Sequence, residues 1–157
     1  MKTIYLLRHA KADKSLINDM GRDLSGKGHR QAESIGQWMS EKGIMPDWII
    51  SSSAKRAKAT AKISSERIGY QKSIRFEDSL YDAGSDTYLD IIAALNNKYD
   101  SVMMVGHNPA TSAMVTILTG VQLDMSPGTL VCIESDIDEW SSVRDANSTM
   151  KWFQIPS

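Results

Sequence analysis

The strongest constraint in the sequence is an alternation of short apolar runs with longer segments whose apolar residues recur at helical spacing. Two runs, residues 3–8 and 101–105, are typical of parallel strands that are covered on both faces. Between them, Ser25 is a typical N-cap for a helix that we expect to reach about Lys42 and to stop at Gly43. Strands that alternate with helices indicate a mostly parallel sheet.

The whole pattern predicts an α/β fold, a three-layer sandwich whose mostly parallel central sheet of about six strands has helices on both faces. The other helices are expected at 56–68, 87–96 and 110–118, and the other parallel strands at 47–51 and 74–77. Residues 129–134 and 149–155 are predicted to be two edge strands, antiparallel to each other. No repeat or Pro/Gly-rich linker interrupts the chain, so we predict one domain over residues 1–157.

Composition argues against several classes of protein. The formal net charge is −1, which gives no electrostatic footprint for nucleic acid or for an anionic membrane, so we expect neither as a partner. The single cysteine, Cys132, lies in an apolar run, and we interpret it as a small buried hydrophobe. We find no secretory signal pattern and no apolar window as long as a membrane span. We therefore expect a cytoplasmic protein.

Polar residues with reactive side chains follow several of the predicted strands directly. His9 follows the first strand, and His107 follows the strand at 101–105. Ligands of open α/β sheets bind outside the carboxyl ends of parallel strands, so both histidines are expected in one crevice. Arg56 begins a helix after the strand at 47–51, where backbone N–H groups also favour an anion. The loop after the third strand adds Asp82.

The chemistry of this set suits phosphoryl transfer. A neutral imidazole is a good nucleophile toward phosphorus when its other ring nitrogen is held as a donor. Arg8 and Arg56 would grip phosphoryl oxygens in a fork geometry that lysine cannot copy. A second histidine, His107, would stabilise charge on the transferring group, and such donors typically contribute ~3–4 kcal/mol each. We therefore expect neither a metal nor a cofactor.

Three segments resemble, in the correct order, motifs of the histidine phosphatase superfamily: 7–10 (Leu-Arg-His-Ala), 51–57 with Thr60, and 105–108 (Val-Gly-His-Asn). Residues 24–32 resemble the start of that family's first helix. The short length and residues 80–83 (Leu-Tyr-Asp-Ala) resemble the SixA-type phosphohistidine phosphatases. The resemblance spans residues 4–155 and implies a phosphoglycerate mutase-like fold. One departure is Ala10, which stands where the usual signature has glycine, the residue that best tolerates a positive φ.

The resemblance also implies roles for individual residues. His9 would be the residue that is transiently phosphorylated. The phosphate pocket would be completed by Arg8, Arg56, His107 and Asn108. Asp82 stands where many relatives carry the acid that protonates the leaving group, although a turn residue beside Gly84 is an alternative interpretation.

The connections around the expected site, residues 9–25 and 74–87, are short, which predicts an open crevice. We therefore predict a metal-independent phosphatase that acts on phosphohistidine of a protein, such as a signalling or phosphotransfer protein. Imidazole leaves with little acid assistance, because its conjugate acid has a pKa of ~6.5. Two alternatives stay open: a small-molecule phosphomonoesterase on the same scaffold with Asp82 as an essential acid, and a non-catalytic module that binds a phosphorylated partner.

Overall fold

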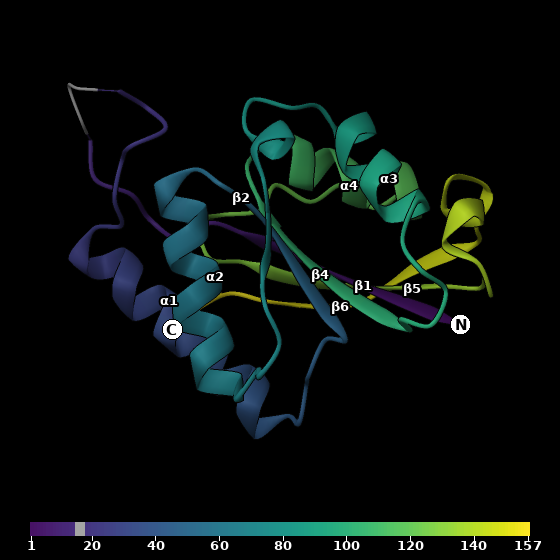
Figure 1. The fold of residues 1–157 in the computed structure, drawn as a ribbon, viewed down its shortest axis with the longest axis horizontal. Coiled ribbons are helices and arrows are strands. Elements are labelled where there is room, and N and C mark those ends of the chain that lie inside the picture. The colour runs from purple at the N-terminus through teal and green to yellow at the C-terminus, as the bar shows by residue number, and fades with distance from the viewer. Residues whose placement is uncertain (15–17) are drawn as a thin grey trace.

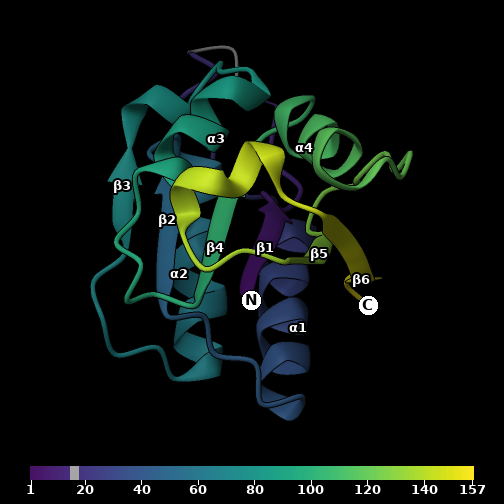
Figure 2. The same ribbon diagram turned by 90° about the vertical axis from the view of Figure 1, so that its right-hand side faces the viewer.

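A computed structural model describes residues 1–14 and 18–157, and Figures 1 and 2 show its sheet between two layers of helices. Residues 15–17, part of the 9–25 connection, lie outside the described residues. The strands are β1 (Lys2–Arg8), β2 (Trp48–Ser52), β3 (Arg75–Glu77), β4 (Ser101–Gly106), β5 (Leu130–Ser135) and β6 (Ser148–Gln154). The α-helices are α1 (Gly26–Glu41), α2 (Lys55–Ile68), α3 (Ser85–Ala93) and α4 (Ala110–Thr119).

The six strands lie in the order β3-β2-β4-β1-β5-β6. The first four are parallel to one another, and β5 is antiparallel to both of its neighbours, β1 and β6. This topology confirms the predicted α/β class with a mostly parallel sheet and an antiparallel pair at one edge. It also brings the carboxyl ends of β1, β2 and β4 together, because these three strands are adjacent and share a direction.

Both faces of the central strands are buried, as their continuous apolar runs predict. Along β1 the pleat sends Leu6 into one core with α3 and α4, and Leu7 into a second core with α1 and α2. Figure 2 shows α3 and α4 on one side of the sheet and α1 and α2 on the other. The two helical layers therefore cover opposite faces and leave the strand ends for the site.

Helices α1 and α2 pack closely at Gly36. A Cβ atom at this position would lie 2.9 Å from the Cα of Ser64 on α2, so a larger residue would push the helices apart. As predicted, Ser25 caps α1, and its hydroxyl accepts a hydrogen bond from the Gly28 N–H (3.0 Å). Close packing of the two helices fixes the position of the first turn of α2, where Arg56 lies.

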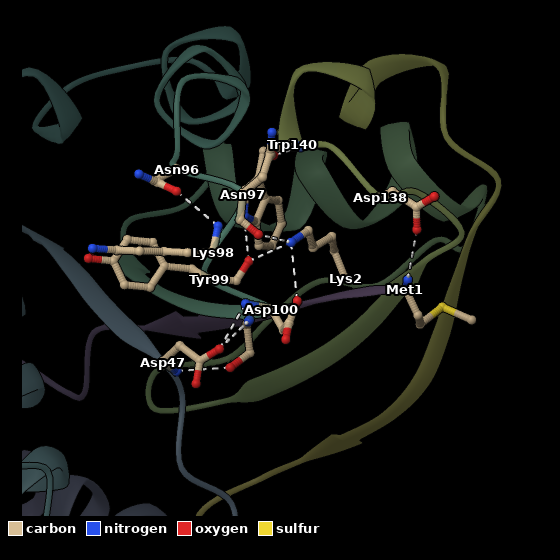
Figure 3. A network of polar contacts seen from close by, with 11 residues as sticks. Met1, Lys2, Asp47, Asn96, Asn97, Lys98, Tyr99, Asp100, Asp138 and Trp140 are labelled. Atoms are coloured by element: carbon tan, nitrogen blue, oxygen red, sulfur yellow. Dashed lines mark hydrogen bonds and ion pairs between the residues drawn. The ribbon is translucent and has the colours of Figure 1, made fainter.

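The amino ends of β1 and β4 are joined by a buried ammonium group (Figure 3). Lys2 is 3% exposed, and its Nζ donates to the carbonyl oxygens of Asn97 and Tyr99 (2.7 Å each) and to Oδ1 of Asp100 (3.2 Å). These three bonds use all three protons of the ammonium group, which is the condition for burying such a charge. The network lies at the end of the sheet opposite to His9.

Two features differ from the sequence expectation. Helix α3 spans Ser85–Ala93 rather than 87–96, and the 3₁₀ segments Asp78–Leu80 and Trp140–Asp145 were not predicted. Trp140 is fully buried in the core against α3 and α4, so its burial holds a turn that has no regular periodicity of its own. None of the helices in the described part of the chain has both the length and the apolar character needed to span a bilayer.

Candidate active site

His9 directly follows β1, and its ring has a fixed tautomer. Its backbone N–H donates to the Gly106 carbonyl (2.9 Å), which ties the end of β1 to the end of β4. Its Nδ1 lies 2.8 Å from the carbonyl oxygen of Ala10. Because a carbonyl oxygen can only accept a hydrogen bond, Nδ1 carries the proton. Nε2 of His9 therefore keeps a free lone pair when the ring is neutral.

The residue after His9 is held by α2. The N–H of Ala10 donates to Oγ1 of Thr60 (3.0 Å), and that hydroxyl donates to the Arg56 carbonyl (2.8 Å). Ala10 is fully buried, and among the described non-glycine residues only Asp82 has a positive φ. The alanine that departs from the family signature thus has no need of the conformation that glycine would permit.

His107 follows β4, and its ring centre lies 5.2 Å from that of His9. Its Nε2 lies 2.8 Å from Oγ of Ser52, the last residue of β2. Ser52 Oγ accepts the Ala54 N–H (3.2 Å), and within the described residues its own hydrogen meets no acceptor other than Nε2 of His107, so we assign that hydrogen to Nε2. That assignment leaves Nδ1 of His107 as an N–H donor.

The position of His107 depends on close backbone packing against Tyr88. The Tyr88 hydroxyl accepts the His107 backbone N–H (3.1 Å) and donates to the Leu80 carbonyl (3.3 Å). A Cβ at Gly106 would overlap the Tyr88 ring. Glycine is therefore required at this position by the close approach of an aromatic side chain.

The two arginines bring positive charge to the same strand ends. Arg56 is 7% exposed; its Nη1 donates to the Asp19 carbonyl (2.7 Å), and its Nη2 lies 3.0 Å from Oδ2 of Asp19. Arg8 donates from Nη1 to the Met125 carbonyl (2.7 Å). Three buried polar atoms have no hydrogen-bond partner within the described residues: Nε of Arg8, Nε of Arg56 and Nδ1 of His107. Unpaired buried donors of this kind cost ~1–3 kcal/mol each, and an oxyanion would satisfy them.

Both histidines are neutral at pH 7. Burial is the main cause that lowers the pKa of His9 to about 3, with further contributions from the charges of His107, Arg56 and Arg8. Burial, followed by the charge of Arg56, lowers the pKa of His107 to about 4. A neutral His9 with its proton on Nδ1 is the nucleophilic form.

These pKa values predict that the protein loses stability in mildly acidic solution. The unfolded chain binds protons on His9 and His107 near pH 6.5 but the folded chain does not, so the stabilisation is complete above pH 6.5. It is lost as the pH falls through about 4 for His107 and about 3 for His9, by on the order of a few kcal/mol in total. Urea unfolding at several pH values measures this effect. A variant with the exposed His29 changed to Ala should follow the wild-type curve, and a flat wild-type curve over this range would contradict the assignment.

Tyr81, rather than Asp82, lies against the site residues His107 and Arg56. The Tyr81 ring lies edge-on to His107 at 5.8 Å between centres and 5.9 Å from Cζ of Arg56. Its hydroxyl donates to Oδ2 of Asp19 (2.6 Å), and this bond raises the pKa of Tyr81. Asp82 is exposed, with a φ of 54°, and it makes none of the side-chain hydrogen bonds found among the described residues. An acid role for Asp82 stays a prediction.

Asn108 supports the site from the side. Its Nδ2 donates to Oδ1 of Asp124 (3.2 Å) and to the Met125 carbonyl (3.0 Å), the same oxygen that Arg8 binds. Its Oδ1 accepts bonds from the hydroxyls of Thr111 (2.7 Å) and Ser112 (2.8 Å). The side chain thus holds α4 against the 124–125 segment, and its predicted contact with phosphate stays a prediction.

The structure therefore brings together four of the predicted residues, His9, Arg8, Arg56 and His107. Three further residues at the site were not predicted from the sequence: Ser52, Tyr81 and Asp19. Ser52 ends an apolar strand next to the one that carries His107, which is a signal that could have identified it. Asp19 lies in a loop without periodicity, so no pattern connects it with Arg56. Within the described chain no group of three or more His, Cys, Asp or Glu side chains is arranged to hold a metal ion.

Comparison with known proteins agrees with this geometry. The model of the histidine phosphatase superfamily (branch 1) matches residues 4–85. The chain belongs to the histidine phosphatase superfamily. The matched residues include His9, Arg8 and Arg56, and the phosphatase function expected at the level of the family is confirmed.

Individual relatives extend this similarity over the whole chain. This chain is 29% identical to a proposed phosphohistidine phosphatase SixA from Agrobacterium tumefaciens, with a TM-score of 0.86 over 99% of this chain and 98% of the relative. A proposed SixA from Nakamurella multipartitia is 25% identical, with a TM-score of 0.89 over 99% and 96% of the two chains. An uncharacterized Mycobacterium tuberculosis protein is 25% identical over 161 residues, 96% of this chain and 99% of the relative. The predicted phosphoglycerate mutase-like fold and the SixA-type resemblance are confirmed.

Proposed function

We propose that this protein removes phosphate from phosphohistidine on a protein, without a metal ion, and that the phosphoryl group passes through Nε2 of His9. The observation that carries the proposal is the Nδ1 contact of His9 with the Ala10 carbonyl (2.8 Å), which directs the free lone pair to Nε2. Family membership supports the phosphatase chemistry. The similarity to structures described as SixA phosphohistidine phosphatases supports phosphohistidine as the substrate.

The reaction has two balanced steps. Nε2 of His9 forms a bond to phosphorus while the bond from phosphorus to the substrate's imidazole nitrogen breaks, and the leaving imidazole takes up a proton from solvent water. The oxygen of a water molecule then forms a bond to phosphorus while the bond from phosphorus to Nε2 of His9 breaks, which releases the water's protons with inorganic phosphate and restores the neutral ring. Arg8 and Arg56 hold the phosphoryl oxygens, and Nδ1–H of His107 stabilises the charge that develops on them.

The leaving group favours phosphohistidine over an alkyl phosphate. Imidazole has a conjugate acid of pKa ~6.5 and leaves readily, whereas an alkoxide needs a positioned acid. Asp19 is the carboxylate that pairs with Arg56, and its pKa is held below its usual range by its bonds to Tyr81, Arg22 and Arg56. An ionised carboxylate cannot protonate a leaving group. The pairing of Asp19 with Arg56 therefore supports a substrate whose leaving group departs without a proton from an acidic side chain.

Hydrolysis of a phosphohistidine protein and of an alkyl phosphate in the presence of EDTA tests this proposal. We expect turnover that EDTA does not change and a kcat/KM at least ~100-fold higher for the phosphohistidine protein, because the imidazole leaves without an acid. Faster turnover of sugar phosphates than of the phosphohistidine protein would overturn the proposed substrate. Loss of activity in EDTA that added metal restores would overturn the metal-independent mechanism.

The small-molecule phosphomonoesterase with Asp82 as an essential acid makes a different prediction. Because the Asp82 side chain is exposed and has no hydrogen bond to the histidines or arginines, we expect Asp82→Asn to change kcat on any phosphate substrate by less than ~3-fold. Asp145→Asn, at another exposed carboxylate, is the matched control. A loss of ~100-fold or more on alkyl phosphates in Asp82→Asn alone would favour the phosphomonoesterase.

A further inference from the structure

A groove of about 780 Å³ lies beside the segment that carries the nucleophile. Its charged side chains are Lys11, Lys27 and Arg30, no Asp or Glu side chain lines it, and its apolar lining includes Pro127 and Ile155. We call this surface the basic groove. Its charge is local, because the whole chain has a formal net charge of −1.

The three cationic side chains of the basic groove have no ion-pair partner among the described residues. All three side chains are exposed, and none of them takes part in the ion pairs found among the described residues. Lys27 and Arg30 also lie in the first turns of α1, which has no acidic residue in its first turn. The N-terminus of a helix carries partial positive charge and favours anions over cations. These cations thus oppose the local electrostatics, and an anion bound in the groove would relieve the repulsion.

The basic groove has a fixed position relative to His9. The Lys11 carbonyl accepts bonds from both the N–H (2.9 Å) and the hydroxyl (3.1 Å) of Ser25, and the Lys11 N–H donates to Oε1 of Gln31 (2.9 Å). A Cβ at Gly28 would overlap the Lys11 carbonyl, so α1 begins directly on this backbone. Lys11 is only two residues from His9, a backbone distance of at most ~7 Å.

A second part of the groove's lining is anchored to the segment that carries His9. The N–H of Gly128 donates to the carbonyl oxygens of Arg8 and His9 (3.1 Å each). Pro127, which lines the groove, precedes that glycine. A chain that presents a phosphorylated residue to His9 can therefore continue directly into the basic groove.

We propose that the basic groove binds an acidic segment that flanks the phosphorylated residue of the protein substrate. This inference rests on the proposed function. Carboxylates of the segment pair with Lys27 and Arg30, and an apolar side chain packs on Pro127 and Ile155. A polypeptide fits better than a compact anion, because the cations come from two segments of chain and the same groove is also lined by apolar side chains.

Two synthetic phosphohistidine peptides test the proposal, one flanked by Asp and Glu and the other by Asn and Gln at the same positions. With the wild-type protein we expect kcat/KM to be ~10-fold higher for the acidic peptide, mostly through KM, since exposed charge pairs are individually weak. High salt should remove the difference. Lys27→Glu with Arg30→Glu should abolish or reverse the preference and leave turnover of the neutral peptide unchanged.

The matched control reverses two exposed lysines outside the groove, Lys62→Glu with Lys98→Glu, and so has the same net charge as the Lys27→Glu, Arg30→Glu variant. Figure 3 shows Lys98 near Lys2 and Asp100, at the end of the sheet opposite to His9. This control variant should retain the wild-type preference. Equal turnover of both peptides by the wild type would overturn the docking proposal but leave the phosphohistidine phosphatase intact. No turnover of either peptide, with p-nitrophenyl phosphate still hydrolysed, would overturn the proposed function itself. The double variant could instead lose kcat/KM only on a small bisphosphate, such as glucose 1,6-bisphosphate, and not on the acidic peptide. That result would show that the groove binds a second phosphate and would overturn the acidic-segment proposal.

Discussion

Replacement of His9 by Ala is expected to lower kcat by at least ~1000-fold on every phosphate substrate, because it removes the atom that accepts the phosphoryl group. Reaction of the wild-type protein with a ³²P-labelled substrate should leave label on the protein. The label should be stable in alkali and labile in acid, as a phosphoramidate is. His9→Ala should carry no label. Its fold should be retained, since the backbone N–H of residue 9 still binds the Gly106 carbonyl.

His29→Ala is the matched control, because His29 is an exposed histidine on α1. It should label and turn over like the wild type. Undiminished turnover by His9→Ala would mean that another residue is the nucleophile. Tight binding of phosphate by the wild type without turnover or label would instead identify the chain as a phosphate-binding module.

The fold could be predicted because its determinants are local. The unbroken apolar runs of β1 and β4 and the cap of α1 at Ser25 are sequence patterns with a direct physical meaning. Helix α3 begins earlier than predicted because Ser85 and Asp86, which open it, are also typical turn residues. The 3₁₀ turn at Trp140 was missed because burial of one large side chain, rather than any periodicity, holds it.

The residues of the site likewise divide into those that local sequence patterns predict and those that only tertiary contacts bring to the site. His9, His107 and Arg56 could be predicted, since parallel topology brings the residues that follow neighbouring strands to one edge. Tyr81 and Asp82 are adjacent in sequence, and only the conformation of the 78–84 loop decides which of them contacts His107. Asp19 reaches Arg56 across 37 positions of sequence, and this pairing is a tertiary contact that leaves no local pattern.

Asp19 and the substrate phosphate use the same partner, Arg56. The guanidinium already makes two bonds to Asp19, through Nη1 and Nη2, and its Nε is the buried atom without a partner. Asp19 thus holds the plane of the guanidinium while another edge stays available for a phosphoryl oxygen. The planar shape of the arginine, and not only its charge, is what allows it to bind both groups at once.

Arg56→Lys tests this role of shape. Lysine keeps the positive charge and can still pair with Asp19, but it cannot also hold a phosphoryl oxygen in the fork geometry, so we expect kcat/KM to fall ~100-fold. Arg67→Lys on the same helix, where an exposed arginine pairs with Glu33 (3.0 Å), should leave kcat/KM unchanged. Thermal unfolding of both variants should stay close to that of the wild type, which separates loss of catalysis from loss of folding. If Arg56→Lys kept kcat/KM within ~3-fold of the wild type, charge alone would be sufficient and the fork geometry would have no catalytic role.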